Sequence, residues 1–375
     1  MRWLIIPDKF KGTMSSQEVI NIMERLLKRY DDQAVCEVVH IADGGEGTLD
    51  FFMHHGGGKQ VKTHVTGPHF ERVEAGYVLL NDHQTAVIEM AQAAGYEQAK
   101  YHLNPLKTTT YGVGELMIDA VQHGANHLMI GCGGSSTNDG GAGMLAACGI
   151  TFLDQKGNIF IPTGGTLDQI HTMRTDDINP LLKTVKITIL SDVTHPLTGP
   201  HGASMIFSIQ KGASDGIAKH LDRNMMHYAS LMESTLKTSK KDSPGVGAAG
   251  GLAYGLSMIF PSVIRSGFDV MWESIDLDER IESFDIILTG EGKIDQQSID
   301  GKVIMKLLHH INKRKPVYAW CGQQEGNLAS LYDAGLTDII SVYPSSSDYL
   351  KRQGHEKADF ERAFESWIKH KLRGH

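Results

Sequence analysis

Runs of apolar and β-branched residues recur along the chain, and several lead through a glycine-rich or acidic turn into a segment with helical periodicity. This order is typical of α/β proteins with a parallel sheet. The clearest strand-like runs are residues 3–6, 35–41, 127–130, 185–190, 285–288, 317–320 and 338–342, and the clearest helical segments are 16–30, 112–123, 142–148, 217–236 and 301–311. We therefore expect a parallel-sheet α/β fold, with ligand-binding loops outside the carboxyl ends of the strands.

The chain is too long for one domain. Its 375 residues exceed the size at which one hydrophobic core usually keeps growing, so two or three domains are expected. Residues 61–90 alternate short β-like runs with Gly-Pro and Asn-Asp turns and lack helical periodicity, so a second domain is predicted to open there. The lysine-, serine- and glycine-rich residues 237–251 mark a second candidate boundary.

Charge and cysteine usage exclude several classes of protein. The formal net charge is −8, and no run of lysine or arginine forms a stripe that could neutralise a nucleic-acid backbone. The four cysteines contain no C-x-x-C pair, which argues against a zinc knuckle or a dithiol redox site. The apolar run at residues 3–6 is too short for a signal peptide, and no stretch approaches ~18 uninterrupted apolar residues. We expect a cytoplasmic protein that binds neither nucleic acid nor membrane.

The segment PDKFKGTMSSQEV, residues 7–19, joins the first strand to the first helix. Ser15 and Glu18 stand at capping-box spacing, so the turn from Asp8 onward is aimed at a helix N-terminus. Unpaired N–H groups there, together with Lys9 and Lys11, would favour an anion. The alternative, an ordinary loop whose lysines are solvated, stays open for this segment alone.

A second candidate is GCGGSSTNDGGAGM, residues 131–144, between an apolar strand and an apolar helix. Its glycines permit close backbone approach to a ligand, and its hydroxyl and amide side chains could cradle a phosphate. The residues concerned are Gly133, Gly134, Ser135, Ser136, Thr137 and Asn138. The loop is not a Walker A sequence and does not fit G-x-G-x-x-G. Tight helix–strand packing is the alternative explanation for the glycines.

A third candidate is TGEGKIDQQSIDGK, residues 289–302, which follows an apolar strand. Glu291, Lys293 and Asp295 alternate, so in an extended loop they would share one side and could hold a phosphate with its metal or position a hydroxyl. A surface salt-bridge loop is the alternative.

Two further acidic strand ends resemble the third candidate: IADGGEG, with Asp43, and LSDVTHP, with Asp192. Carboxylates at strand ends beside glycine-rich loops are what an enzyme acting on a magnesium–nucleotide complex needs. Arg265 could bind a substrate carboxylate through its guanidinium, although an ordinary ion pair is the alternative. No histidine pattern predicts a metal site, and no G-x-S-x-G motif predicts a serine hydrolase.

Taken in order, these segments resemble the motifs of the bacterial glycerate kinase family. The blocks that carry the resemblance are PDKFKGTMSSQEV, ADGGEGTLDF, IEMAQAAGY, NPLKTTTYGVGELM, GCGGSSTNDGGAGML, SDVTHPLTGPHGA, GAAGGLAYGL and TGEGKIDQQSIDGK. They run from about residue 1 to about residue 345. Two departures are Thr194-His195, where the family usually has Asp-Asn, and Ser266, where it usually has proline.

The resemblance implies ATP-dependent phosphorylation of D-glycerate, in this bacterial class usually to 2-phospho-D-glycerate. It also implies two α/β domains with a cleft between them. One, residues 1–60 plus 256–375, would be Rossmann- or flavodoxin-like with a parallel sheet built from both chain ends, and the other, residues 61–255, would be inserted.

Roles for the candidate residues follow as hypotheses, since phosphoryl transfer needs positioning and charge neutralisation more than covalent chemistry. Lys9 and Lys11 would face the transferred phosphoryl group, and residues 133–138 would hold the nucleotide phosphates. Asp192 and Asp295 are the leading candidates for Mg²⁺ ligand or general base. Supporting roles would fall to Asp43 and Glu291 toward the metal, and to Asp8, Lys293 and Arg265 toward substrate.

Two rival functions remain at this stage. The same fold could phosphorylate the 3-hydroxyl of glycerate or another short hydroxy acid. A sensor that binds the sugar acid without turnover is the non-enzymatic alternative, although the chain shows no basic helix-turn-helix segment. A homo-oligomer is possible on the sequence, which does not decide the oligomeric state.

Overall fold

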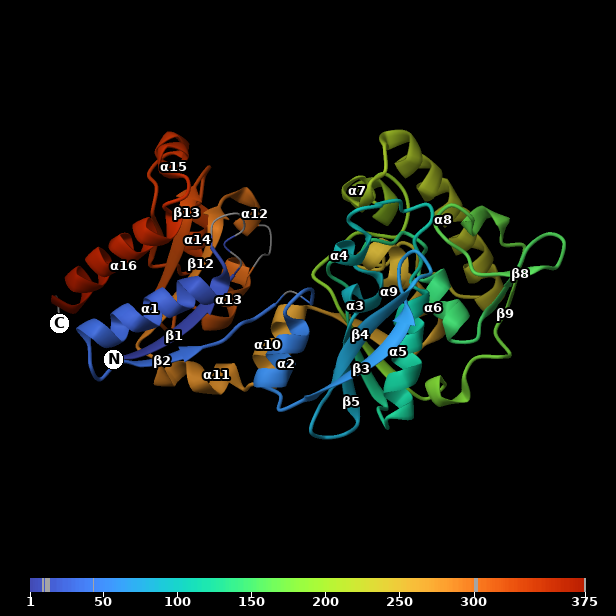
Figure 1. The fold of residues 1–375 in the computed structure, drawn as a ribbon, viewed down its shortest axis with the longest axis horizontal. Helices are drawn as coiled ribbons and strands as arrows, with labels where there is room; N and C mark the ends of the chain where they lie inside the picture. Colours follow the sequence, from blue (N-terminus) through green and yellow to red (C-terminus); the bar gives the residue numbers. More distant parts are fainter. Residues whose placement is uncertain (9, 11–13, 43, 300–302, 374–375) are drawn as a thin grey trace. The chain divides into compact units, whose positions relative to one another are not determined.

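The computed structural model describes residues 1–375 except 9, 11–13, 43, 300–302 and 374–375. The chain divides into two compact units (Figure 1). Unit 1 comprises residues 1–42 and 271–375, and unit 2 comprises residues 43–270. The prediction that both chain ends build one α/β domain around an inserted one matches this order.

The unit boundaries differ from the expected ones, which lay at 60/61 and 255/256. Helix α2 (Thr48–His54) belongs to unit 2, where the Leu49 backbone N–H donates to the buried Glu89 carboxylate at 2.9 Å. Strand β11 (Ser262–Arg265) pairs in parallel with β10 (Lys186–Leu190) of the same unit. Contacts within unit 2 therefore hold both α2 and β11 in that unit. The residue composition near the expected boundaries does not indicate these contacts.

Unit 1 is built on a parallel five-stranded sheet in the order β14-β13-β12-β1-β2. Its strands are β1 (Arg2–Pro7), β2 (Val35–Val38), β12 (Ile286–Ile294), β13 (Val317–Gln324) and β14 (Asp338–Ser341). Its helices are α1 (Ser16–Tyr30), α11 (Leu277–Arg280), α12 (Gln296–Ile299), α13 (Val303–Ile311), α14 (Ala329–Asp333), α15 (Ser346–Arg352) and α16 (Glu356–Arg373), with the 3₁₀ turn η4 (Ile281–Ser283), and α10 (Gly267–Ser274) crosses the unit boundary.

Helix α1 shows how the sequence determines this packing. The Ser15 hydroxyl accepts from the Glu18 N–H, and the Glu18 carboxylate accepts from the Ser15 N–H, so the predicted capping box is present. The apolar face of α1 is buried beside α16 (Figure 1), whose Phe360 and Phe364 pack against Trp320 of β13. One part of the core of unit 1 therefore lies between its sheet and these two helices.

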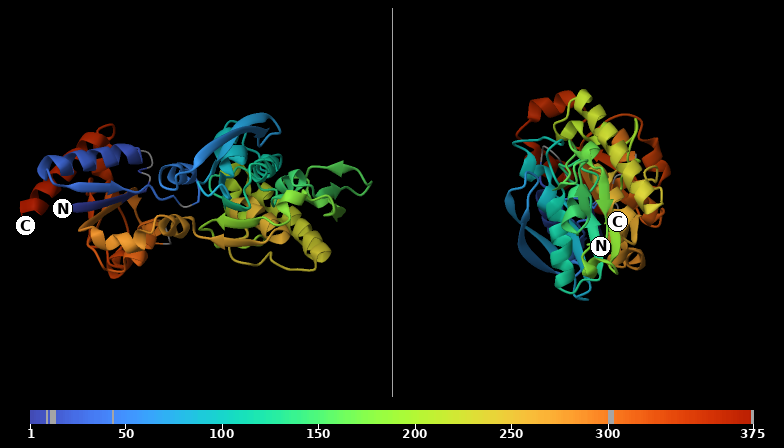
Figure 2. Two further views of the ribbon diagram at one scale, coloured as in Figure 1. Left: turned by 90° about the horizontal axis from the view of Figure 1, so that it is seen from below. Right: turned by 90° about the vertical axis from the view of Figure 1, so that its right-hand side faces the viewer.

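Unit 2 contains a mixed six-stranded sheet in the order β11-β10-β6-β5-β4-β3. Strands β3 (Lys59–Thr66), β4 (Arg72–Leu79) and β5 (Thr85–Glu89) pair antiparallel in the region where residues 61–90 were predicted to alternate β-like runs with turns. β6 (His127–Gly131) pairs in parallel with both β5 and β10. A small antiparallel sheet of β7 (Thr151–Leu153), β8 (Ile159–Phe160) and β9 (Thr172–Arg174) projects from the rest of unit 2 (Figure 2).

Helices cover the large sheet of unit 2 and complete its core. They are α3 (Ala91–Ala94), α4 (Tyr96–Ala99), α5 (Tyr111–Gln122), α6 (Ala142–Ala147), α7 (Ala203–Phe207), α8 (Asp215–Leu236) and α9 (Ala248–Ile259), with the 3₁₀ turns η1 (Leu167–Gln169), η2 (Pro180–Leu182) and η3 (Ile209–Lys211). In the described part of the chain no helix is both long and apolar enough to span a membrane. The parallel sheet of unit 1 and the mixed sheet of unit 2, each covered by helices, confirm the predicted α/β class.

Candidate functional site

Four strands of unit 2 end at the same edge of the large sheet. Glu89 of β5 stands beside Gly131 of β6, Gly131 beside Leu190 of β10, and Leu190 beside Arg265 of β11. The glycine-rich loop follows Gly131, and Asp192 follows Leu190 by two residues. The sheet therefore brings three predicted features, this loop, Asp192 and Arg265, to one edge.

The first part of the glycine-rich loop lies tightly against neighbouring backbone. The Gly133 N–H donates to the Gly44 carbonyl at 3.2 Å, and the Gly134 carbonyl accepts from the Tyr96 N–H at 2.7 Å. A Cβ on Gly133 would lie 2.3 Å from the Gly45 Cα, so no larger residue fits there. Part of the glycine content is thus explained by packing, the alternative considered from the sequence.

The second part of the loop is fully buried. Ser136 uses its hydroxyl and its N–H on the Ala94 carbonyl, both at 3.0 Å, and the Asn138 amide donates to the Ser204 hydroxyl at 2.9 Å. The Thr137 hydroxyl and the Asn138 side-chain carbonyl are buried with no hydrogen-bond partner among the described residues. Ser135 is half-buried, lines a cavity with Gly133 and Gly134, and so is the hydroxyl of the loop best placed to meet a ligand.

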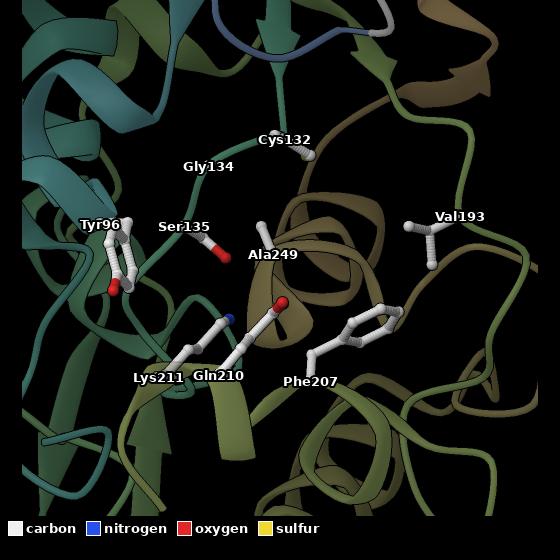
Figure 3. Close-up of a pocket in the computed structure, with 10 residues that line it drawn as sticks. Tyr96, Cys132, Gly134, Ser135, Val193, Phe207, Gln210, Lys211 and Ala249 are labelled. Carbon is white, nitrogen blue, oxygen red and sulfur yellow. The ribbon is translucent and has the colours of Figure 1, made fainter. Parts of the chain in front are cut away.

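That cavity has a volume of about 470 Å³ (Figure 3), which lies within the range of about 300–1,000 Å³ usual for small-molecule sites. The glycine-rich loop forms one side, and η3 and the start of α9 contribute others (Figure 3). Its lining residues are Tyr96, Cys132, Gly133, Gly134, Ser135, Val193, Phe207, Gln210, Lys211 and Ala249. Most of the side chains in this set are apolar, and Lys211 carries its one ammonium group.

Lys211 is a site residue that the sequence reasoning missed. Its side chain is 1% exposed, and its Nζ donates to the Thr137 carbonyl at 2.6 Å. Burial disfavours the charged ammonium and lowers the pKa of Lys211 to about 7, while the negative charge of Asp139 acts in the opposite direction. A lysine within FSIQKGAS looks like a surface residue in the sequence, so no local signal marks its burial.

Asp139 shares this buried region and is held by the backbone. Its carboxylate accepts hydrogen bonds from the N–H and hydroxyl of Thr110, both at 2.8 Å, and from the N–H groups of Gly141 and Gly143, at 3.1 and 3.2 Å. Burial raises the pKa of Asp139, and these four donors oppose that rise. The carboxylate therefore fixes the turn that leads into α6.

The start of α9 supports the loop from another side. Ala249, Gly250 and Gly251 adopt left-handed conformations, with φ of 53°, 64° and 87°, before the right-handed helix continues. The Gly250 carbonyl accepts from the Gly140 N–H at 3.0 Å. A Cβ on Gly250 would lie 2.1 Å from the Thr137 carbonyl oxygen, so glycine is required both by the backbone conformation and by the contact.

In unit 1 the third candidate segment forms part of a strand. β12 continues through Ile294 because its second half pairs with β13, so residues 289–294 are not the extended loop that was expected. Lys293 is exposed and forms ion pairs with Asp295 at 3.7 Å and Glu325 at 2.5 Å, and the Glu325 carboxylate raises its pKa. The side chains of Lys293 and Asp295 thus lie on the same side of the chain, as predicted. Their exposed ion pair also fits the alternative of a surface salt bridge. Glu291 is buried in the strand.

The first turn of the chain is described only in part. The Asp8 N–H donates to the Gly290 carbonyl at 2.8 Å, which joins this turn to the middle of β12, and the Asp8 carbonyl accepts from the Ser16 hydroxyl at 3.1 Å. Lys9, Lys11 and Asp43 lie outside the described residues.

The predicted carboxylates can be tested for a metal site. No group of three or more metal-ligating side chains occurs among the residues that the structure describes. Mg²⁺ in enzymes that act on nucleotides is usually held by one or two carboxylates together with phosphate oxygens and water. Single carboxylates such as Asp192 and Asp295, placed beside strand ends, fit a metal that arrives with a nucleotide and do not fit an all-protein cage.

Comparison with known proteins places these features in context. The model of the family described as "Glycerate kinase family" matches residues 3–370. A glycerate kinase from Bacillus cereus and a glycerate 2-kinase from Escherichia coli are each 38% identical to the chain, and each match covers 92% of this chain and 91% of the relative. A crystal structure described as that of a candidate glycerate kinase 2 from Salmonella typhimurium LT2 superposes with a TM-score of 0.82, at 34% identity, over 100% of this chain and 99% of that chain.

Proposed function

Because the chain belongs to the glycerate kinase family, we propose that it transfers the γ-phosphoryl group of ATP to a hydroxyl of D-glycerate, giving 2-phospho-D-glycerate. The chain is an enzyme, a phosphotransferase that acts on an alcohol group. The observation that carries the proposal is the family match over residues 3–370, which includes every candidate segment. A glycine-rich loop beside a cavity, as found in unit 2, supports it.

In unit 2, we assign nucleotide phosphates to the loop of residues 133–138. Gly133, Gly134 and Ser135 line the cavity, so their backbone and hydroxyl groups are those that would contact phosphate oxygens. Ser136, Thr137 and Asn138 are buried and would hold the loop in shape. Arg265, at the end of β11, would bind the glycerate carboxylate through its guanidinium. Asp192 is assigned as general base toward the glycerate hydroxyl or as a ligand of the metal.

In unit 1, the same proposal gives the turn after β1 and the end of β12 to the transferred group. Lys9 and Lys11 would neutralise charge on the phosphoryl group, as lysines do in phosphoryl transfer. Asp295 is the second candidate for base or metal ligand. Asp8 and Lys293 would support substrate binding. Glu291 and Asp43 would support the metal.

Mg²⁺ enters this reaction as the magnesium complex of ATP, a substrate. When bound, it would neutralise the charge that develops on the phosphate oxygens. The carboxylates of this chain would then orient that complex, and one of them would accept the proton of the glycerate hydroxyl as the oxygen attacks phosphorus.

We also propose that the two units act as the two functional domains, and that the protein is cytoplasmic. D-glycerate and ATP would be the partners, with no nucleic acid and no membrane. The oligomeric state, including a possible homo-oligomer, remains to be measured by light scattering.

The direct test is ADP release by the purified protein with Mg-ATP and D-glycerate, with L-glycerate and acid-free controls. Phosphorus NMR of the product distinguishes the 2-phosphate from the 3-phosphate. Turnover that needs D-glycerate and yields the 2-phosphate supports the proposal. A 3-phosphate product would overturn the regiochemistry, and binding of both ligands without ADP release would favour the sensor.

A further inference from the structure

Lys211 places an amino group that can carry a positive charge in the wall of the cavity of unit 2. Its side chain is 1% exposed, and Figure 3 shows its amino group directed toward the space enclosed by Ser135, Ala249 and Phe207. An ammonium has three N–H donors, and the hydrogen bond to the Thr137 carbonyl is the one it makes to other residues of the described chain. Donors therefore remain that can serve a ligand in the cavity.

No described carboxylate forms an ion pair with this ammonium. Asp139 is the acidic group whose charge acts on it, and the four donors from Thr110, Gly141 and Gly143 occupy that carboxylate. Cys132, the other titratable group facing Lys211, is buried, and burial raises the pKa of its thiol to about 12, so it stays neutral. Because burying a charge is costly unless it is paired, this arrangement favours an anionic ligand.

The remaining walls indicate what kind of anion. Tyr96, Val193 and Phe207 offer apolar surface, which a three-carbon hydroxy acid cannot use but a nucleoside can. Ser135, on the glycine-rich loop, offers a hydroxyl group that a phosphate can accept a hydrogen bond from. A nucleoside polyphosphate satisfies both parts of the cavity.

We propose that Lys211 is a binding residue for a phosphate group of a nucleotide that occupies the cavity of unit 2. This inference rests on the proposed function in naming a nucleotide as the ligand. Where Lys211 is neutral before binding, it takes a proton from solvent to become the ammonium that pairs with the phosphate, and no covalent bond between protein and ligand forms or breaks.

The number of protons taken up when the ligand binds can be measured. A lysine that only supports the fold would not change this number. Burial lowers the pKa of Lys211 to about 7 in the empty cavity, so the side chain is less protonated at pH 8 than at pH 6. Pairing with phosphate raises that pKa, so binding should take up more of a proton at pH 8 than at pH 6. Calorimetric titration with Mg-ADP in buffers of different ionisation enthalpy measures this number.

Three matched variants separate charge from packing. K211M should abolish the uptake at pH 8 and weaken Mg-ADP binding about 10- to 100-fold, as expected for loss of a charge-assisted hydrogen bond. K211R keeps the charge without titrating, so binding should persist without uptake. Gln210→Met changes a neighbouring cavity residue and should leave the proton count unaltered. Adenosine, which lacks phosphate, should bind wild type and K211M alike with no uptake.

Uptake that persists in K211M, or unchanged affinity of K211M for Mg-ADP, would overturn the inference. If K211M does not fold, the wild-type counts decide, since equal proton counts for Mg-ADP and adenosine would also overturn it. Glycerate-dependent ADP release is measured in parallel. Turnover without Lys211-dependent uptake refutes this inference alone, whereas Lys211-dependent uptake without turnover refutes the proposed function alone.

Discussion

Replacing Gly250 by alanine should destabilise unit 2 through two separable effects. The residue has φ of 64°, and an L-residue in the left-handed region costs about 1–2 kcal/mol relative to its usual conformation. The new Cβ would also lie 2.1 Å from the Thr137 carbonyl oxygen and 2.7 Å from the Asn138 Cα, both backbone atoms. Overpacking of this kind costs about 1–3 kcal/mol. Alanine also lowers the conformational entropy of the unfolded chain, which stabilises the folded protein by about 0.4–1 kcal/mol.

The net loss expected for Gly250→Ala is therefore about 1.5–4 kcal/mol in the free energy of unfolding. Gly157→Ala is the matched control, because Gly157 has φ of 82°, lies in the same unit and has no atom within 4 Å of an added Cβ. It should cost about 0.5–1.5 kcal/mol from the backbone alone. Urea unfolding at constant temperature measures both values from the midpoint and the slope.

The difference between the two variants isolates the contact with Thr137. If Gly250→Ala costs no more than Gly157→Ala, the close contact of Gly250 with the Thr137 carbonyl does not restrict the residue at this position, and the reasoning is refuted. A third variant, Ala249→Gly, tests the backbone effect in the opposite direction. Ala249 has φ of 53°, so glycine should raise the stability of unit 2 by up to about 1 kcal/mol.

Three further predictions concern charged groups. Asn in place of Asp192 or of Asp295 should lower kcat by about 10²-fold or more if that aspartate is the base, and near-normal turnover by both variants would exclude the assignment. Without ligand, Lys211 loses its proton in the folded protein above about pH 7, whereas in the unfolded chain it keeps the proton up to about pH 10.4. The free energy of unfolding should therefore rise with pH in that window, by up to about 1.4 kcal/mol per pH unit. Chemical denaturation should find this slope in the wild type and not in K211M. Asp359 accepts hydrogen bonds from two arginines and a tyrosine, chiefly from Arg352, which lowers its pKa below that of an unfolded aspartate. Asp359→Asn should therefore cost about 1–3 kcal/mol at pH 7, and the deficit should shrink as the pH falls below about 4; a deficit that does not change with pH would refute the electrostatic explanation.

The parts of the fold that could be predicted from the sequence are those with local signals. Helix α1 was predicted with its observed bounds, Ser16–Tyr30, because its capping box and apolar periodicity are both local. The antiparallel hairpins of unit 2 followed from turn residues and the loss of helical periodicity. The sequence pattern did not predict the second half of β12. Glycine and lysine, as at Gly290 and Lys293, have little preference for strands, and these residues form a strand because they pair with β13.

The candidate site divides in the same way. The glycine-rich loop is visible as a sequence pattern, whereas the burial of Lys211 depends on Thr137, which lies far away in the chain. Likewise, nothing near Gly250 indicates that it must pass against the Thr137 carbonyl. Composition indicates which chemistry a loop can offer, but tertiary contacts decide which of its side chains reach the ligand.

The discontinuous sheet of unit 1 has a consequence for synthesis on the ribosome. β1 ends at Pro7, but its neighbour β12 begins at Ile286, and roughly 280 residues take about 15–55 s to translate at rates of ~5–20 residues per second. During that time β1 has β2 alone as a partner in this sheet, and an isolated pair of strands is at best marginally stable. Unit 2 is contiguous and emerges whole in the interval. The nascent chain must therefore keep its apolar first strand from aggregating until β12, in the last quarter of the protein, has been made, which gives chaperones a defined segment and a defined time in which to act.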